Sequence, residues 1–216
     1  MFDEIINELK GTNTRLVAVS KTKPNAQLMV LYDKGQRVFG ENYVQELVDK
    51  NASMPTDIEW HFIGHLQSNK VKYIAPFVAM IHSIDSFKLL QEVNKQAIKH
   101  NKIIKCLLQF HIAEEETKFG FDTEGSLLML ESAAFKDLKN VELCGVMGMA
   151  TFTENKGQVK REFQALKGIF DTLKTHYFAD NGGFKDISMG MSDDYKLAIA
   201  EGSTVVRIGS LIFGKR

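Results

Sequence analysis

Short apolar runs alternate with amphipathic stretches along most of the chain. Nearly continuous runs such as Leu16-Val17-Ala18-Val19 and Cys106-Leu107-Leu108-Gln109-Phe110 are typical of strands buried on both faces. Runs of this kind predict strands at 15–20, 36–40, 58–63, 78–84, 103–112, 141–149, 185–190 and 204–209. Apolar residues with helical spacing predict helices between them, near 25–34, 42–51, 67–75, 86–100, 123–136, 156–177 and 193–201. A short amphipathic helix that ends at Gly11 precedes the first strand.

The alternation of eight strands with helices predicts one parallel β/α domain over residues 1–216, because no linker rich in Pro, Gly or Ser interrupts it. Eight such units are what a (β/α)8 TIM-type barrel needs, and such barrels begin at about 200 residues. The predicted fold is therefore a single-domain barrel with an extra N-terminal helix. A doubly wound open sheet is the alternative.

The composition narrows the class of protein. The chain has 216 residues, 44% hydrophobic and 25% charged, which is typical of a soluble globular protein. Its 27 basic and 27 acidic residues balance, so nothing predicts binding to nucleic acid or to an anionic membrane. No apolar run approaches the roughly 20 residues of a membrane span, and the acidic N-terminus does not resemble a signal peptide. Cys106 and Cys144 lie in apolar runs without a C-x-x-C motif, which predicts reduced, buried thiols and a cytoplasmic protein.

Lys21 is the first candidate for chemistry, because it stands where the first buried strand gives way to a loop. Pro24 suits the first turn of the helix that follows. Burying an ammonium group without a partner is unfavourable, and the same burial favours the neutral, nucleophilic amine. Lys21 is therefore either a reactive amine or a structural lysine whose ammonium group reaches solvent at the strand end.

Two stretches rich in glycine and serine follow the seventh and eighth predicted strands. In barrels, the loops after these strands often bind phosphate, together with the start of a short helix. Gly190-Met191-Ser192 opens a predicted helix and can hold an anion, and Gly209-Ser210 offers a second open backbone with a hydroxyl. Ser192 can instead be a plain helix cap, and Asp193 and Asp194 would repel a phosphate unless they point away. The two stretches together predict a phosphate site.

Arg207 lies inside the eighth predicted strand, where its guanidinium needs a partner because it does not give up its proton. The partner is either a carboxylate, such as Glu41 or Asp193, or an acceptor on a ligand, such as a heterocyclic nitrogen. A lysine for an aldehyde, hydroxyls for a phosphate and an arginine for a ring acceptor together suggest pyridoxal 5′-phosphate (PLP).

Other polar and aromatic residues favour structural roles. His61 and His65 are four apart across a strand-to-loop junction, unlike the two histidines of a zinc-binding H-E-x-x-H helix, so no metal site is predicted. His61 is expected to line the barrel or to hydrogen-bond across it. The acidic run Glu114-Glu115-Glu116 is expected to be a solvated loop. Packing roles are expected for Phe62, Phe110, Phe119 and Phe121.

Several motifs run in order from about residue 15 to 214: Ala-Val-Ser-Lys21-Thr-Lys-Pro, Phe-Gly-Glu-Asn42-Tyr-Val-Gln-Glu, Trp-His-Phe-Ile-Gly-His-Leu-Gln-Ser-Asn-Lys, Lys-Phe-Gly, Gly145-Val-Met-Gly-Met, Ser-Met-Gly-Met-Ser192-Asp-Asp and Val-Arg207-Ile-Gly-Ser-Leu-Ile-Phe-Gly. Together they closely resemble the pyridoxal phosphate homeostasis proteins, single-domain relatives of the N-terminal barrel of alanine racemase. The resemblance implies a Schiff base between PLP and Lys21, and not Lys23. It implies that Arg207 faces the pyridine nitrogen. The other implied cofactor contacts are Ser192, Gly209 and Ser210 at the phosphate, with Asn42 and Met147 nearby.

An arginine at the pyridine nitrogen would leave the ring neutral, and a neutral ring stabilises a carbanion poorly. Related racemases use a second base from another domain, and no candidate for it remains in this sequence. The resemblance therefore implies a non-catalytic PLP-binding protein of vitamin B6 and amino-acid homeostasis, expected to be a monomer with PLP-dependent apoenzymes as partners. The alternatives are an amino-acid racemase that uses Lys21 with either solvent or a tyrosine, Tyr43 being the nearest, as the acid, and a barrel that binds another phosphate ester without covalent chemistry.

Overall fold

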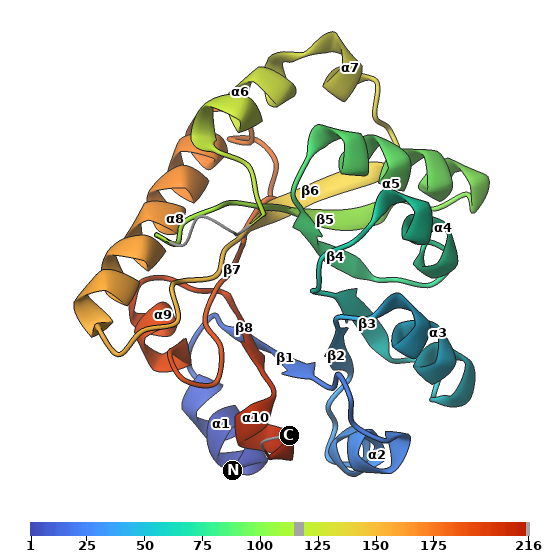
Figure 1. Cartoon of the computed structure of the whole chain (residues 1–216), viewed down its shortest axis with the longest axis vertical. Helices are drawn as coiled ribbons and strands as arrows, with labels where there is room; N and C mark the ends of the chain where they lie inside the picture. Colours follow the sequence, from blue (N-terminus) through green and yellow to red (C-terminus); the bar gives the residue numbers. More distant parts are fainter. Residues whose placement is uncertain (115–118, 215–216) are drawn as a thin grey trace.

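The computed structural model describes residues 1–114 and 119–214. Its centre is a closed barrel of parallel strands, in which each strand neighbours the next and β8 pairs with β1 (Figure 1). The strands are β1 (Arg15–Val19), β2 (Val38–Glu41), β3 (Glu59–Phe62), β4 (Met80–Ile84), β5 (Ile104–Gln109), β6 (Val141–Met147), β7 (Asp186–Ser188) and β8 (Val205–Ile208). This topology confirms the predicted (β/α)8 barrel and excludes the open sheet.

Helices surround the strands, as Figure 1 shows. They are α1 (Phe2–Leu9), α2 (Asn25–Asp33), α3 (Val44–Ser53), the 3₁₀ helix η1 (Ser68–Lys70), α4 (Val71–Ile74), α5 (Phe87–Lys99), α6 (Thr123–Glu131), α7 (Ala133–Lys136), α8 (Lys156–His176), α9 (Tyr195–Ala200) and α10 (Ser210–Phe213). The helix predicted at 123–136 is two helices, because Ser132 caps α7 by accepting a hydrogen bond from the N–H of Phe135. Pro24 comes directly before α2 instead of in its first turn.

The extra N-terminal helix fills a place in the outer ring that the short α10 leaves open. Glu8 of α1 accepts hydrogen bonds from Tyr195 Oη at 2.6 Å and Lys196 Nζ at 2.8 Å, both on α9. At the other side, Asp3 accepts one from Lys34, which follows α2. The predicted N-terminal helix is thus present, and it closes the ring between α9 and α2 beside α10 (Figure 1).

The main apolar core lies between the strands and the helices. Phe62, Phe110 and Phe121 are buried in it, as predicted. The packing role predicted for Phe119 is wrong: its side chain is exposed and stacks on His65, with ring centroids 4.1 Å apart. In the predicted acidic loop, Glu114 is exposed, whereas Glu115 and Glu116 lie outside the described residues.

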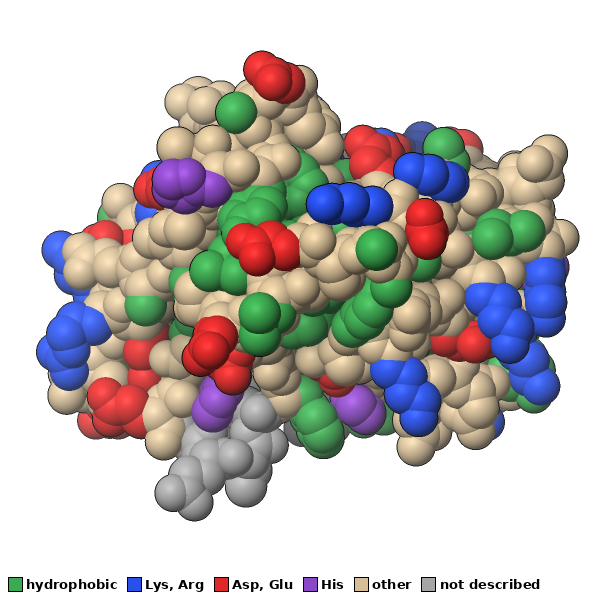
Figure 2. Space-filling view, turned by 90° about the horizontal axis from the view of Figure 1, so that it is seen from above, with side chains coloured by type: hydrophobic (Ala, Val, Ile, Leu, Met, Phe, Trp, Pro, Cys, Tyr) green, Lys and Arg blue, Asp and Glu red, His purple; other side chains and the backbone are tan. Residues whose placement is uncertain are grey.

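The face that carries α6 and α7 shows hydrophobic side chains gathered in its middle, with charged side chains around them (Figure 2). Leu128 of α6 contributes one of the most exposed large apolar side chains, at 64%. Within the described part of the chain, no helix has both the length and the apolar character that crossing a membrane requires.

Inside the barrel, side chains paired in register point to the same side and form layers. Val17 pairs with Arg207, and Gly40 pairs with both Val19 and His61. A Cβ on Gly40 would lie 2.7 Å from Val17 Cγ1, so only glycine fits this layer. Met80, Leu107, Cys144 and Met147 form a small apolar cluster separate from the main core. Both cysteines are free and buried, as predicted.

Candidate functional site

Lys21 lies in a tight turn at the carboxyl end of β1. The N–H of Ser20 still bonds to Gly40 O of β2 at 3.0 Å, and the N–H of Lys23 then bonds back to Ser20 O at 3.1 Å. Lys21 is half-buried in this turn, and Thr22 beside it adopts the left-handed conformation, with φ of 63°. The turn therefore presents Lys21 at the end of the barrel where βα loops form functional sites.

The nearby Lys23 is directed elsewhere. Its Nζ donates hydrogen bonds to Phe213 O and Gly214 O, each at 3.1 Å, at the end of α10. Lys23 therefore helps to fasten the C-terminal segment to the β1 loop. Of the two lysines in the Lys21-Thr22-Lys23 stretch, the structure leaves Lys21 as the candidate for the site.

Arg207 is almost completely buried in β8, on the interior layer next to Val17. Its Nη1 donates to Ser188 Oγ at 2.6 Å and its Nη2 to Gly148 O at 3.1 Å. The prediction that Arg207 forms an ion pair with Glu41 or Asp193 is wrong, because Glu41 pairs with Lys50 and Asp193 is exposed. Burial lowers the pKa of Arg207 to about 10, which still leaves the guanidinium charged at neutral pH.

Two histidines extend the hydrogen bonds of Arg207 across the barrel. His82 Nδ1 lies 3.0 Å from Ser188 Oγ, and His82 Nε2 lies 2.9 Å from His61 Nδ1. His61 lines the barrel, as predicted. Its own hydrogen bond goes to His82 on the neighbouring strand β4, and His82 continues the hydrogen bonds across the barrel to Ser188 on β7. Sequence reasoning missed His82 and Ser188, which lie in the short strands β4 and β7.

Arg207 can only donate, so Ser188 Oγ accepts its hydrogen bond. A neutral histidine ring has one nitrogen that donates and one that accepts, so His82 can bond to Ser188 and to His61 at the same time. Burial lowers the pKa of both histidines, that of His61 to about 3, so both rings are neutral at pH 7.

The loops after β7 and β8 lie against each other. Ser192 Oγ accepts a weak hydrogen bond from the N–H of Leu211 at 3.4 Å, and the N–H of Arg207 bonds to Gly190 O at 3.0 Å. Gly190 has φ of 94°, and a Cβ there would lie 2.5 Å from the Cβ of Ala198. The two hydrogen bonds between the loops bring the Ser192 and Ser210 segments to the same corner of the barrel.

The prediction that a helix opens at Gly190–Ser192 is wrong, because α9 begins only at Tyr195. Ser192 is not its cap. Asp194 precedes the helix, and its Oδ1 accepts a hydrogen bond from the N–H of Met191 at 2.6 Å. Burial raises the pKa of Asp194, and the hydrogen bond from the Met191 N–H opposes this shift.

Two further predicted residues line this end of the barrel. Asn42 follows β2, and its Oδ1 is buried with no hydrogen-bond partner among the described residues. Met147 ends β6, is completely buried, and pairs in register with Gln109 and Ser188. Met147 therefore shares a layer with the residues that hold Arg207. Tyr43, in contrast, is 52% exposed ahead of α3.

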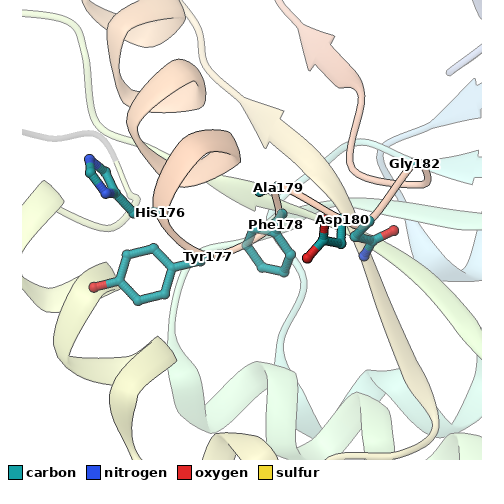
Figure 3. A pocket seen from close by; sticks show the side chains of 7 residues that line it. His176, Tyr177, Phe178, Ala179, Asp180 and Gly182 are labelled. Carbon is teal, nitrogen blue, oxygen red and sulfur yellow. The ribbon is translucent and has the colours of Figure 1, made fainter.

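A hollow of the surface lies at the opposite end of the barrel. It measures about 550 Å³ and is lined by residues 176–182, the loop that leads from α8 to β7 (Figure 3). A second hollow of about 320 Å³ is lined by Phe135, Leu138, Lys139 and neighbouring residues before β5 and β6. Both lie before the amino ends of their strands, so neither touches Lys21 or Arg207. Among the described residues, no group of three His, Cys, Asp or Glu side chains could hold a metal ion.

The geometry first defines a class: a (β/α)8 barrel with polar side chains converging at the carboxyl ends of β7, β8, β1 and β2. The family model for the alanine racemase N-terminal domain matches residues 2–216. A pyridoxal phosphate homeostasis protein of Aquifex aeolicus (strain VF5) is 40% identical over 209 residues, covering 96% of this chain and 90% of that protein. The chain belongs to the alanine racemase N-terminal domain family and, within it, to the pyridoxal phosphate homeostasis proteins.

Solved structures agree with this assignment. The structure of PipY from Synechococcus elongatus PCC7942, with PLP bound, is similar with a TM-score of 0.87 and 32% identity over 99% of this chain and 98% of that chain. Alanine racemase from Bartonella henselae is similar with a TM-score of 0.72 and 13% identity, over 59% of that longer chain. The likeness to the racemase shows the fold alone.

Proposed function

We propose that this protein binds PLP, holds it as a Schiff base on Lys21, and acts in intracellular vitamin B6 homeostasis without catalysis. The observation that carries the proposal is the convergence of Lys21 with Arg207 and the Ser192 and Ser210 loops at one corner of the barrel. Its relatives support the same assignment, because the Aquifex relative is named for PLP homeostasis and PipY has been seen with PLP bound.

The residues at this corner fit the cofactor. When bound, PLP supplies an aldehyde that an amine can attack and a ring that can accept electrons. The two hydrogen bonds of Arg207 use two of its five N–H groups, which leaves donors for the ring nitrogen. The unpartnered Oδ1 of Asn42 offers an acceptor, and the hydroxyls of Ser192 and Ser210 with the backbone of Gly209 would hold the phosphate. Met147 would pack near the ring.

The same geometry favours binding over turnover. A charged arginine donates a hydrogen bond to the ring nitrogen but does not protonate it, so the ring remains a weak electron acceptor. A racemase would need a second acid or base on the opposite face of its substrate. Tyr43, the residue considered for that role, is exposed ahead of α3. The relatives also carry the name of a homeostasis protein, not that of an enzyme.

Further parts of the proposal concern the whole protein. We expect residues 1–216 to act as one PLP-binding unit in the cytoplasm, as a monomer that hands PLP to PLP-dependent apoenzymes. The two buried free thiols are consistent with a reducing compartment. Light scattering of the holo-protein after gel filtration tests the monomer, and PLP transfer to an apoenzyme across a dialysis membrane tests whether delivery needs contact.

The absorption spectrum of the purified protein tests the proposed function. We expect an absorption band of a protein-bound Schiff base that disappears on borohydride reduction, with the reduced adduct found on the Lys21 peptide by mass spectrometry. A colourless protein without a reducible adduct would favour a barrel that binds another phosphate ester. Sustained exchange of the α-proton of L- or D-amino acids, lost in Lys21→Ala, would favour a racemase instead.

A further inference from the structure

A buried charged cluster lies behind the turn that carries Lys21. It consists of Glu41 at the end of β2 with Glu46 and Lys50 of α3. Lys50 Nζ donates hydrogen bonds to Glu41 Oε1 and to Glu46 Oε1, each at 2.7 Å. Glu41 is completely buried and Lys50 is 5% exposed, so this pair is shielded from solvent, whereas Glu46 is partly exposed.

The cluster holds the two peptide groups that flank Lys21. Lys50 Nζ also donates to Ser20 O at 2.7 Å, which is the carbonyl of the peptide bond before Lys21. Glu46 Oε1 accepts from the N–H of Thr22 at 2.6 Å, which belongs to the peptide bond after Lys21. Ser20 Oγ adds a third contact, by donating to Glu41 Oε1 at 2.6 Å. The backbone on both sides of the Lys21 Cα is therefore fixed by charged groups.

The backbone held in this way is strained. Thr22 has φ of 63°, a conformation that a β-branched residue rarely adopts. A strained residue persists only where its surroundings hold it. The bond from Glu46 to the Thr22 N–H supplies that hold, because it is made to the strained residue itself.

Stability alone gives little reason for such a cluster. Removing charged groups from water is unfavourable, and replacing a buried ion pair by apolar residues is often neutral or stabilising. Burial raises the pKa of Glu41 despite the opposing hydrogen bonds from Lys50 and Ser20. Glu41 Oε2 is buried and has no hydrogen-bond partner in the described part of the chain.

We propose that Glu41, Glu46 and Lys50 are positioning residues, which hold the Ser20–Thr22 turn so that the Lys21 amine is aimed at the PLP aldehyde before PLP arrives. This inference rests on the proposed function. The step it assists forms a C=N bond between Lys21 Nζ and the aldehyde carbon, and the aldehyde oxygen leaves as water. Fixing the backbone beforehand removes an ordering cost that binding would otherwise include.

Glu46→Ala tests the proposal, because Glu46 is partly exposed and its loss leaves the Glu41–Lys50 pair in place. Two ligands are compared by titration: PLP, and pyridoxine 5′-phosphate, which has an alcohol in place of the aldehyde. We expect about tenfold weaker binding of PLP, as the loss of one hydrogen bond to a charged group predicts. We expect slower formation of the borohydride-reducible adduct, and binding of pyridoxine 5′-phosphate within twofold of wild type.

Three further variants complete the design. Glu46→Gln keeps an oxygen that can accept from the Thr22 N–H, and is expected to recover most of the PLP affinity. Lys50→Met is expected to give the same difference between the two ligands if Glu46→Ala does not fold.

Glu162→Ala is the matched control. Glu162 of α8 also accepts hydrogen bonds from loop N–H groups, and its Oε2 accepts from the N–H of Thr151 at 2.7 Å. This loop follows β6 and is not the turn after β1. The PLP binding of this variant is expected to be unchanged.

The outcomes separate two kinds of failure. Unchanged PLP binding in Glu46→Ala, or an equal loss for both ligands, would overturn the positioning role. Wild-type protein that binds pyridoxine 5′-phosphate and PLP equally and yields no reducible adduct would overturn the proposed function instead.

Discussion

The two ends of the barrel differ in what they offer a ligand. The carboxyl end carries the strained Lys21–Thr22 turn, the buried Arg207 and an unpartnered acceptor on Asn42. The amino end carries the two hollows of about 550 and 320 Å³, lined by loop residues 176–182 and by side chains such as Leu138. These two hollows therefore do not lie at the end that carries the candidate chemistry.

This difference follows from the direction of the strands. In a parallel barrel, all βα loops leave at one end, so side chains far apart in sequence converge there. At the other end, loops only return the chain from each helix to the next strand. A hollow in such a loop, as between α8 and β7 in Figure 3, has space without converging charged donors. The comparison between the two ends can be tested by substituting similar residues at each.

The largest difference is expected between Lys21 at the carboxyl end and Lys139 at the amino end. Lys21→Ala should abolish the borohydride-reducible PLP adduct while leaving the fold intact, because one half-buried lysine in a turn contributes little to packing. Lys139→Ala, in the amino-end hollow, should leave the adduct unchanged. Circular dichroism checks the fold, and mass spectrometry of the reduced protein counts the adduct. An adduct retained in Lys21→Ala would move the site to another lysine, with Lys23 the first to examine.

The next largest effect is expected at Arg207 of β8, which is compared with Arg15 of the neighbouring strand β1. Arg207→Met should weaken PLP binding about tenfold or more and shift the absorption band of the bound cofactor, because a charged donor to the ring is lost. Arg15→Met, at the amino end, removes an ion pair with the buried Asp186 and should lower the free energy of unfolding by about 1–3 kcal/mol. Equal PLP affinity in wild type and Arg207→Met would make Arg207 a structural residue.

A smaller effect is expected from the histidine pair between the two ends. The folded protein keeps both rings neutral, with the pKa of His61 lowered from 6.5 to about 3. As pH falls below about 6.5, the unfolded chain binds protons that the folded chain does not, so stability falls with pH. Each histidine should contribute up to about 1.4 kcal/mol per pH unit. Urea unfolding at pH 7 and pH 5 should show a shallower dependence in His61→Gln/His82→Gln than in wild type.

The smallest effect on PLP affinity is expected from a substitution in the amino-end hollow. Phe178 stacks on Phe184 with ring centroids 4.1 Å apart. Phe178→Ala should lower the free energy of unfolding by about 2 kcal/mol, because part of a packed aromatic ring is lost. PLP affinity should stay within twofold of wild type. A larger change in affinity would mean that the two ends are coupled through the barrel.

Much of the fold was predictable from short-range patterns. Apolar runs and helical spacing depend on neighbouring residues, so the alternation of strands and helices could be inferred along the chain. The errors fall where a local contact competes with the pattern. Ser132 caps a new helix within the predicted 123–136 segment, and Asp194 delays α9 until Tyr195. Phe119 was assigned to the core on its residue type, yet it lies on the surface.

The site was only partly predictable. Lys21, Arg207, Ser192 and the Gly209–Ser210 stretch could be identified because each stands at a strand end or interrupts an apolar strand. His82 and Ser188 were missed, since a polar residue in a short strand does not by itself reveal what it faces. Glu46 and Lys50 were missed for a related reason, because they belong to an amphipathic helix whose charged residues suggest only a solvated face.

By itself, then, the sequence determined which segments become strands, where each strand stops, and which reactive side chains stand at those ends. These are properties of residues close together along the chain. Only the tertiary structure determined which residues these side chains contact. Closure of the barrel joins β8 to β1 and sets Arg207 beside Val17, while the packing of α3 places Lys50 behind the Lys21 turn. Such contacts depend on register and closure, which no local pattern specifies.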